Sequence, residues 1–300
     1  MKSLFLEDYE NEAIERIRKF ARIADAMELD IAVGFSGGKD SQVTLHLCER
    51  AGIKFTAYFN HSFESVTTLK FIREHYPQVI RRRDVKEGFI RNIVVNHSGM
   101  LPTVFSAYCC DDYKHQNSKT DACKILGIRK AESAKRAIRR TFEYKNITTQ
   151  KKYKAIASEY FKDECQGVGS HGTIALHPIV DWSEKDVWDY IHKWNLSINP
   201  EYEESNRVGC IVCPKANFTS NHKALIKYPK LIDAFISDLN NSNYDWVITG
   251  DNQDYEHDKV YYICRWLNHS FMPFSKKQEE LYRIVRENYD NYHKFKNKEL

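Results

Sequence analysis

The sequence lacks the features that would place the protein in a membrane or in an export pathway. None of its apolar runs approaches the length of about 18 residues that a membrane-spanning helix needs, and the first residues, MKSLFLED, contain no signal-peptide core. Internal repeats and low-complexity tracts are also absent, and a net charge of +4 is too small to predict a partner by itself. We therefore expect a cytoplasmic globular protein with no membrane partner.

What the sequence does contain fits a folded α/β protein. Its 300 residues, 42% of them hydrophobic and 29% charged, suffice for one large domain plus an appended element. Residues 31–47 combine an apolar run (IAVGF), a glycine turn (SGGKDS) and an amphipathic continuation, which predicts a buried strand, a tight turn and the start of a helix. The turn amides, the hydroxyls of Ser36 and Ser41 and the ammonium of Lys39 would form a cradle sized for phosphate.

Three known glycine turns compete for this segment. A Walker A loop would need Gly at position 33 and Ser or Thr at position 40, where the chain has Val33 and Asp40, so that hypothesis fails. Residues 34–38 satisfy the G-x-S-x-G pattern of a nucleophile elbow, but so short a pattern often arises by chance and here continues into Lys-Asp-Ser. Residues 36–41 match the S-G-G-x-D-S loop of the PP-loop enzymes at every fixed position. A glycine turn that binds no phosphate is the remaining alternative.

The surrounding residues predict a parallel sheet. A second strand at 54–59 follows the helix that ends near residue 51, and a strand–helix–strand unit of this length implies parallel pairing. Phosphate would then lie at the carboxyl edge of the sheet, where Asn60 and Glu64 would meet a ribose unless they are ordinary polar loop residues. The remaining expectations are short strands at 79–80, 124–129 and 174–180, a mobile or inserted segment at 140–170, and helices at 5–28, 183–193, from 221 onward, 257–269 and 275–295.

Positive charge gathers in two places. Residues 129–154 contain ten Lys or Arg against two acidic residues, and Arg81–Arg83 form a second cluster. Such clusters can follow a polyanion, which favours nucleic acid as the partner, and Tyr144 and Tyr153 would add stacking surfaces for bases. A solvated helix face has the same composition, so both interpretations stay open.

Four motifs in order give the chain its resemblance to a known family. They are SGGKDS at 36–41, GIRKAES at 127–133 followed by Arg136, PIVDWS at 178–183, and RVGCIVCP at 207–214. Together they resemble the phosphoadenosine phosphosulfate (PAPS) reductase-like branch of the PP-loop ATP pyrophosphatases, over roughly residues 30–215. The resemblance implies an α/β fold with an open, mostly parallel sheet flanked by helices, Rossmann-like and of the adenine nucleotide α-hydrolase-like type. We expect this domain over residues 1–215 and a helical C-terminal extension over 216–300.

Eight cysteines in a chain without a secretion signal favour metal or redox chemistry over disulfides. Four thiolates, from Cys109, Cys110, Cys210 and Cys213, would suit a [4Fe–4S] cluster or a structural zinc, and plain buried cysteines are the third alternative. Adjacent cysteines chelate a single ion poorly, which favours the cluster. This arrangement also resembles that of the iron–sulfur adenosine phosphosulfate (APS) reductases. Cys123 or Cys165 could take the place of Cys109.

The chain departs from the reductases toward its C-terminal end. Those enzymes carry a Glu-Cys-Gly-x-His tail whose cysteine attacks the substrate sulfur, whereas Cys264 is the only cysteine here after Cys213. Cys264, like Cys48, lies on an apolar helical segment and is expected in the core. We therefore expect no assimilatory reductase. A sulfonucleotide (APS or PAPS) reductase that uses Cys264, and a non-catalytic iron–sulfur module that binds nucleotide, are the alternatives.

The resemblance then implies a neighbouring activity, adenylation of a substrate before sulfur is incorporated, as in the ATP pyrophosphatases of bacterial DNA phosphorothioation. It implies ATP, Mg²⁺ and a [4Fe–4S] cluster as cofactors, with zinc as the alternative to the cluster. The implied partners are a nucleic acid, DNA rather than tRNA, and a cysteine desulfurase as the sulfur donor.

The implied activity predicts roles for individual residues. ATP would bind with its phosphates on the amides of residues 37–41, and Lys39 would neutralise the leaving pyrophosphate. Asp40 would bind Mg²⁺ or brace the loop, or it would only cap the following helix. The expected catalytic residues are Ser36, Lys39, Asp40 and Arg129. Further contacts to the nucleotide or the substrate backbone are expected from Gly37, Gly38, Ser41, Asn60, Glu64, Gly127, Arg136 and Arg207.

Overall fold

The structure is a computed structural model, which describes residues 6–83, 87–95, 97, 101–115, 123–145, 165–167, 173–241, 258–267 and 274–296. The chain divides into two compact units that are interleaved in sequence. The sheet unit comprises Met1–His61, Val66–Arg82 and Asn117–Gly209, and the helical unit comprises Ser62–Ser65, Arg83–Gln116 and Cys210–Leu300. The predicted partition instead cuts the chain once, after residue 215, and stays a prediction.

The described strands of the sheet unit form one seven-stranded sheet in the order β3-β2-β1-β4-β7-β5-β6. Every pairing is parallel except that of β5 with β7, which is antiparallel. The strands are β1 (Ile31–Phe35), β2 (Thr56–Asn60), β3 (Ile80–Arg82), β4 (Cys123–Ile125), β5 (Phe142–Lys145), β6 (Cys165–Gly167) and β7 (Thr173–Leu176). The open, mostly parallel α/β sheet is thus confirmed.

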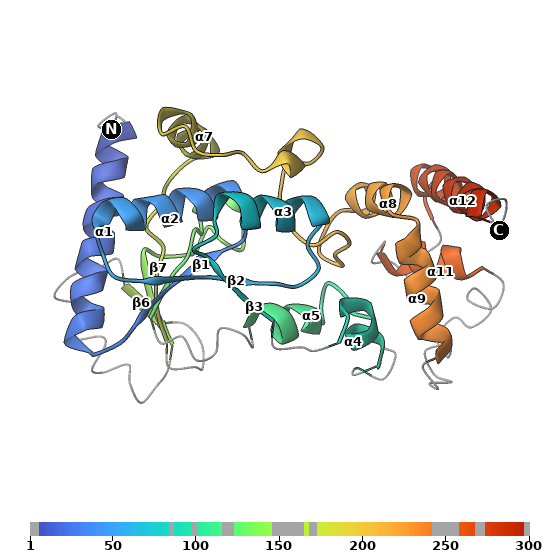
Figure 1. Cartoon of the computed structure of the whole chain (residues 1–300), viewed down its shortest axis with the longest axis horizontal. Helices are drawn as coiled ribbons and strands as arrows, with labels where there is room; N and C mark the ends of the chain where they lie inside the picture. The colour runs from blue at the N-terminus through green and yellow to red at the C-terminus, as the bar shows by residue number, and fades with distance from the viewer. Residues whose placement is uncertain are drawn as a thin grey trace. The chain divides into compact units, whose positions relative to one another are not determined.

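The helices of the sheet unit bury one apolar face each against this sheet or against one another. They are α1 (Leu6–Ala26), α2 (Lys39–Ala51), α3 (Val66–His75) and α7 (Glu184–Lys193), with the short 3₁₀ helices η3 (Lys130–Glu132) and η5 (Pro200–Glu203). In Figure 1, α2 lies over the strands with α1 and α7 beside it, and all three are in contact. Helix α7 begins as predicted, because Ser183 and Asp186 form a reciprocal capping box at its first turn.

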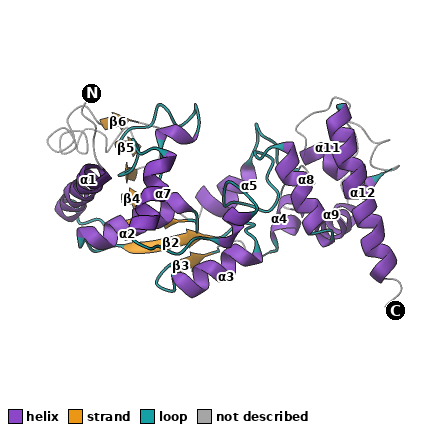
Figure 2. Ribbon diagram, turned by 90° about the horizontal axis from the view of Figure 1, so that it is seen from above, coloured by secondary structure: helices purple, strands orange, loops and turns teal. Residues whose placement is uncertain are grey.

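The helical unit has an apolar core of its own, which includes Leu225, Phe235 and Ile263, all without solvent exposure. Helix α12 packs on α8, and α4 packs on α9 (Figure 2). Its elements are α4 (Phe89–Val95), α5 (Tyr108–Cys110), the π-helical turn η1 (Asp111–His115), α8 (Phe218–Lys227), α9 (Lys230–Asn241), α11 (Lys259–Leu267) and α12 (Lys276–Lys296). Across the described parts of both units, no helix combines the length and apolar character needed to cross a membrane.

The segment predicted as mobile or inserted, residues 140–170, contains two strands instead. Residues 142–145 are β5, which pairs with β7, and residues 165–167 are β6, which pairs with β5. Strands of three or four residues give too little alternation to recognise, so their pairing partners decide them rather than their own sequence. Residues 146–164, with Tyr153 and the end of the basic stretch, lie outside the described part of the chain.

Candidate nucleotide site and cysteine group

The turn between β1 and α2 is held in shape by its own side chains. Ser41 Oγ accepts the N–H of Ser36 at 3.1 Å and donates to the carbonyl of Gly38 at 2.8 Å. Gly37 has a φ of +75°, a conformation that favours glycine, and its carbonyl accepts a hydrogen bond of 3.1 Å from the side-chain Nε2 of Gln42. The first-turn N–H groups of α2 therefore follow an ordered turn at the carboxyl edge of the sheet, which is an arrangement that binds anions.

Lys39 is the cation of this turn. The residue is only 7% exposed, and its ammonium lies 3.5 Å from the Glu184 carboxylate and 3.7 Å from that of Asp40. Two aromatic rings bracket it, Tyr202 at 5.4 Å and Trp188 at 6.0 Å from the ammonium to the ring centroids. The side chain is thus largely shielded from solvent, and its charge is balanced by carboxylates, which suits a group that meets charged phosphate.

Asp40 joins the turn to the GIRKAES motif. The Nε of Arg129 donates to the Asp40 carboxylate, and Arg129 is 3% exposed. The N–H of Arg129 donates to Glu132 at 3.0 Å, which fixes the start of η3. A Cβ added to Gly127 would stand 2.5 Å from the Asp40 carbonyl oxygen. The motif is therefore docked directly on the first turn of α2, and Asp40 braces this contact.

The other predicted nucleotide contacts lie in different surroundings. Asn60 ends β2, beside the turn's own strand β1 in the sheet. Arg136 forms an ion pair with Glu132, and Arg207 is exposed. Glu64 belongs to the helical unit, where it accepts hydrogen bonds from the Ser62 N–H and hydroxyl at 2.8 and 2.6 Å. The roles assigned to these residues from sequence stay predictions.

The four predicted cysteine ligands, Cys109, Cys110, Cys210 and Cys213, all belong to the helical unit. The pKa of Cys109 is raised by a hydrogen bond with Cys110, by burial, and by the nearby thiols of Cys210 and Cys213. The four sulfurs therefore lie near one another. Glu64 and Cys210 pair with each other in an isolated antiparallel β-bridge. The Oγ of Ser62 lies 3.3 Å from the Cys210 sulfur.

Lys114 supplies positive charge to this cysteine group. Its ammonium lies 3.7 Å from Glu64, and its pKa is raised chiefly by Cys210, with burial opposing and Glu64 contributing. Nevertheless, within the described ranges no three His, Cys, Asp or Glu side chains are close enough together to hold a metal ion. Four thiols match an iron–sulfur cluster or zinc in chemistry, but in this structure they are not drawn together as a ligand set.

The alternative cysteine ligands can be compared with these. Cys123 sits on β4 with no exposed surface, inside the apolar core of the sheet unit, and burial raises the pKa of its thiol to about 12. Its surroundings are those of a core residue. Cys165 lies on β6, and its side chain is outside what the structure describes.

Comparison with known proteins settles the family. The profile of the phosphoadenosine phosphosulfate reductase domain matches residues 30–216, more than half of the chain. The chain belongs to this family. As a PAPS reductase-domain protein it is expected to bind a nucleotide in a sulfur-related role, and the matched residues contain the turn, the GIRKAES motif and all four cysteines of the group.

The chain is also similar to several known proteins. Two uncharacterised proteins of Methanocaldococcus jannaschii are 24% identical over 242 residues, covering 80% of this chain and 55% of the relative, and 28% identical over 241 residues, covering 75% and 44%. Sulfate adenylyltransferase subunit 2 of Mesorhizobium japonicum is 27% identical over 213 residues, covering 64% and 66%. The chain thus spans about half the length of the first two relatives.

Among solved structures, the chain is similar to the U34-tRNA thiolase NcsA of Methanococcus maripaludis with its [4Fe–4S] cluster. The two are 16% identical with a TM-score of 0.39, over 89% of this chain and 82% of that one.

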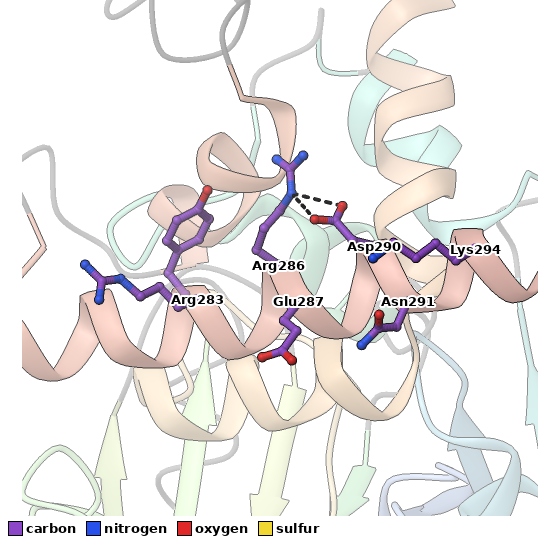
Figure 3. Close-up of a pocket in the computed structure, with 7 residues that line it drawn as sticks. Arg283, Arg286, Glu287, Asp290, Asn291 and Lys294 are labelled. Atoms are coloured by element: carbon purple, nitrogen blue, oxygen red, sulfur yellow. Dashed lines mark hydrogen bonds and ion pairs between the residues drawn. The ribbon is translucent and has the colours of Figure 1, made fainter.

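A surface hollow on α12 is separate from these predicted residues. Its lining consists of Tyr282, Arg283, Arg286, Glu287, Asp290, Asn291 and Lys294. The Nε of Arg286 donates to both carboxylate oxygens of Asp290 at 3.1 Å, as the dashed lines of Figure 3 mark, while Glu287 points the other way. Since Arg286 also donates to Asp258 at 2.8 Å, its charge is already balanced within the helical unit.

Two residues that touch the turn were not predicted from the sequence. Tyr202 accepts the N–H of Lys39 at 2.9 Å, and the fully buried Asn199 donates to the Gly37 carbonyl at 3.1 Å. Tyr202 lies in η5 and Asn199 is the N-cap of η5, and both are 160 residues or more along the chain from the turn. The Asn199-Pro200 pair is a recognisable helix start, but nothing in its local pattern says which part of the protein it contacts.

Proposed function

We propose that the protein is an ATP pyrophosphatase that adenylates a nucleic acid, DNA in preference to tRNA, and so prepares it to receive sulfur. An oxygen of the acceptor attacks the α-phosphorus of ATP, the bond from that phosphorus to the bridging oxygen breaks, and pyrophosphate leaves with the electron pair. The single observation that carries the proposal is the ordered SGGKDS turn, with Lys39 at the N-terminus of α2 and Asp40 braced by Arg129.

Each part of the turn has a task in this step. The amides of residues 37–41 bind phosphate oxygens, and Lys39 neutralises the charge that develops on pyrophosphate. Mg²⁺, if it accompanies ATP, would offset part of the negative charge of the phosphates. The contacts of Asp40 with Arg129 and Lys39 favour a bracing role over a role as metal ligand. Arg129 therefore contributes by fixing α2 and not only by its charge.

The acceptor is assigned from the basic stretch. Within its described part, Lys130 and Arg139 pair with Asp181 at 2.6 Å and with Glu143 at 2.5 Å, whereas Lys135 and Arg140 are exposed. Exposed cations favour a polyanionic acceptor, and binding of such an acceptor should weaken steeply with salt. A cysteine desulfurase would supply the sulfur.

The cysteine group would hold a [4Fe–4S] cluster, with zinc as the alternative. Such a cluster would supply thiolate-bound iron able to bind or pass on sulfur. From this chain, Cys109, Cys110, Cys210 and Cys213 would hold it, and Ser62 and Lys114 would stabilise the negative charge of the sulfurs.

The reductase alternative receives no support from Cys264. That thiol is fully buried in the core of the helical unit, and burial raises its pKa, so it lacks the exposure and thiolate character of a nucleophile.

The test is to measure AMP and pyrophosphate formed from ATP and Mg²⁺ by anaerobically purified protein, with DNA, with tRNA and with neither, counting iron in the same sample. We expect DNA to stimulate the reaction. Lys39→Ala should lower AMP formation by about 100-fold or more, whereas Lys185→Ala, at an exposed helix position, should leave it unchanged. Stimulation by tRNA alone would reassign the acceptor, and full activity of Lys39→Ala would refute the mechanism.

A further inference from the structure

The turn makes a contact that its phosphate-binding role does not require. The hydroxyl of Tyr202 accepts the N–H of Lys39 at 2.9 Å, and a Cβ added to Gly38 would lie 3.3 Å from the same hydroxyl. The oxygen of Tyr202 thus covers the middle of the turn. It stands at the hydrogen-bonding distance from the Lys39 amide where an oxygen of a bound phosphate would have to stand.

Tyr202 also holds the side chain of Lys39. Its ring centroid is 5.4 Å from the ammonium, and its ring meets that of Trp188 edge to face at 5.3 Å. Glu184 completes this bracket at 3.5 Å from the ammonium. Both groups of Lys39 that recognise phosphate, the amide and the ammonium, are therefore engaged by neighbouring side chains.

The segment that carries Tyr202 is anchored to the turn by Asn199. The Asn199 side chain accepts the Glu201 N–H at 3.1 Å, which starts η5. It donates to the Gly37 carbonyl at 3.1 Å and lies 3.3 Å from the hydroxyl of Thr68. Because Asn199 is fully buried, the base of η5 is fixed while Tyr202 reaches over the turn from its far end.

We propose that Tyr202 is a further residue of the nucleotide site, whose hydroxyl occupies the place of a phosphate oxygen and is exchanged for that oxygen when the phosphate chain binds. Two oxygens cannot accept the Lys39 N–H from one position. A hydrogen bond to an ionised phosphate is about twice as strong as one to a neutral hydroxyl, so phosphate wins the exchange. The hydroxyl meanwhile satisfies an amide at the helix start. This inference rests on the proposed binding of phosphate by the turn, but not on the identity of the acceptor.

The exchange has a measurable cost in affinity. Breaking one neutral hydrogen bond costs about 0.5 to 1.5 kcal/mol net, which corresponds to a factor of about 2 to 12 in Kd. Tyr202→Phe removes the hydroxyl and keeps the ring beneath Lys39, so it isolates this contribution. Tyr9→Phe is the matched control, because Tyr9 lies on α1 and packs against Trp182.

The experiment is calorimetric titration of the full chain with inorganic pyrophosphate and then with ATP and Mg²⁺, for wild type and both variants, after urea unfolding has shown that each is folded. We expect Tyr202→Phe to bind both ligands about 2- to 12-fold more tightly and Tyr9→Phe to match wild type. Equal or weaker binding by Tyr202→Phe would overturn the inference, since the hydroxyl would then be neutral or would itself donate to phosphate.

An AMP assay on the same samples separates the two proposals. If Tyr202→Phe forms AMP as the wild type does but binds pyrophosphate and ATP no more tightly, the exchange alone is overturned. Tighter binding by Tyr202→Phe without AMP formation by either protein would support the exchange and overturn the proposed function. Absence of pyrophosphate and ATP binding in both proteins would overturn both.

Discussion

Replacing Gly127 by Ala would place a methyl carbon against the backbone of α2. The new Cβ would lie 2.5 Å from the carbonyl oxygen and 2.8 Å from the carbonyl carbon of Asp40, and 2.8 Å from the hydroxyl of Thr44. Ordinary contacts begin at 3.4 Å, so the first turn of α2 and the GIRKAES motif must separate by about 1 Å. The φ of Gly127 is not in the left-handed region, so the added methyl group acts through this contact alone.

Two effects should follow from the separation. Forcing an extra methyl group into a packed contact costs about 1 to 3 kcal/mol of unfolding free energy. A displacement of about 1 Å at the turn that holds Lys39 should also lower AMP formation by up to about 100-fold. Urea unfolding and the AMP assay measure the two effects separately.

Gly88→Ala is the matched control, because a Cβ at Gly88 would meet no atom within 4 Å. That variant should keep wild-type activity and stability. Wild-type unfolding and AMP formation in Gly127→Ala would show that the motif can move away from α2 freely, and would refute the close docking described above.

Two further predictions concern buried polar groups. Glu10→Gln should lower the unfolding free energy by about 2 to 3 kcal/mol in urea titrations. The buried Glu10 carboxylate accepts hydrogen bonds from Arg50 and Lys193, each at 2.7 Å. An unchanged urea midpoint would contradict this role. Burial lowers the pKa of His222 from 6.5 to about 4, so the unfolded chain binds the extra proton between these values. His222 therefore contributes stability above pH 6.5 that is lost as the pH falls toward 4, and this loss is at most about 3 kcal/mol. The variant His222→Gln should show a smaller fall in the urea midpoint across this pH range.

The parts of the fold that the sequence predicted are those with long or distinctive local patterns. The helix expected at 5–28 is α1, and the strand, turn and helix of residues 31–51 are β1 and α2. The strands β5 and β6 were missed, because their three or four residues acquire strand geometry only through pairing with β7 and with each other. Residues 88–113, for which no helix or strand was predicted, contain α4 and α5.

The candidate site also has features that the sequence predicted and features that it did not. The SGGKDS pattern located the turn and Lys39, because glycines, hydroxyls and a cation beside a strand form a local phosphate cradle. The pairing of Asp40 with Arg129, 89 residues apart, could not be predicted from either motif alone. The cysteine pairs were found by their spacing, yet their spacing did not predict that Ser62, Glu64 and Lys114 would surround Cys210.

The sequence by itself determined the family, the order of the main strands and helices along the chain, and the position of the glycine turn. The elements and the turn depend on residues that are adjacent or a few positions apart, where backbone geometry fixes the relation between side chains, and the family depends on four such local motifs in order. Only the tertiary structure decided that Tyr202 covers the Lys39 amide, that Asn199 anchors it and that Gly127 must lack a side chain. These contacts join segments distant in sequence, and such contacts are set by how the packed elements meet rather than by the pattern within any one of them.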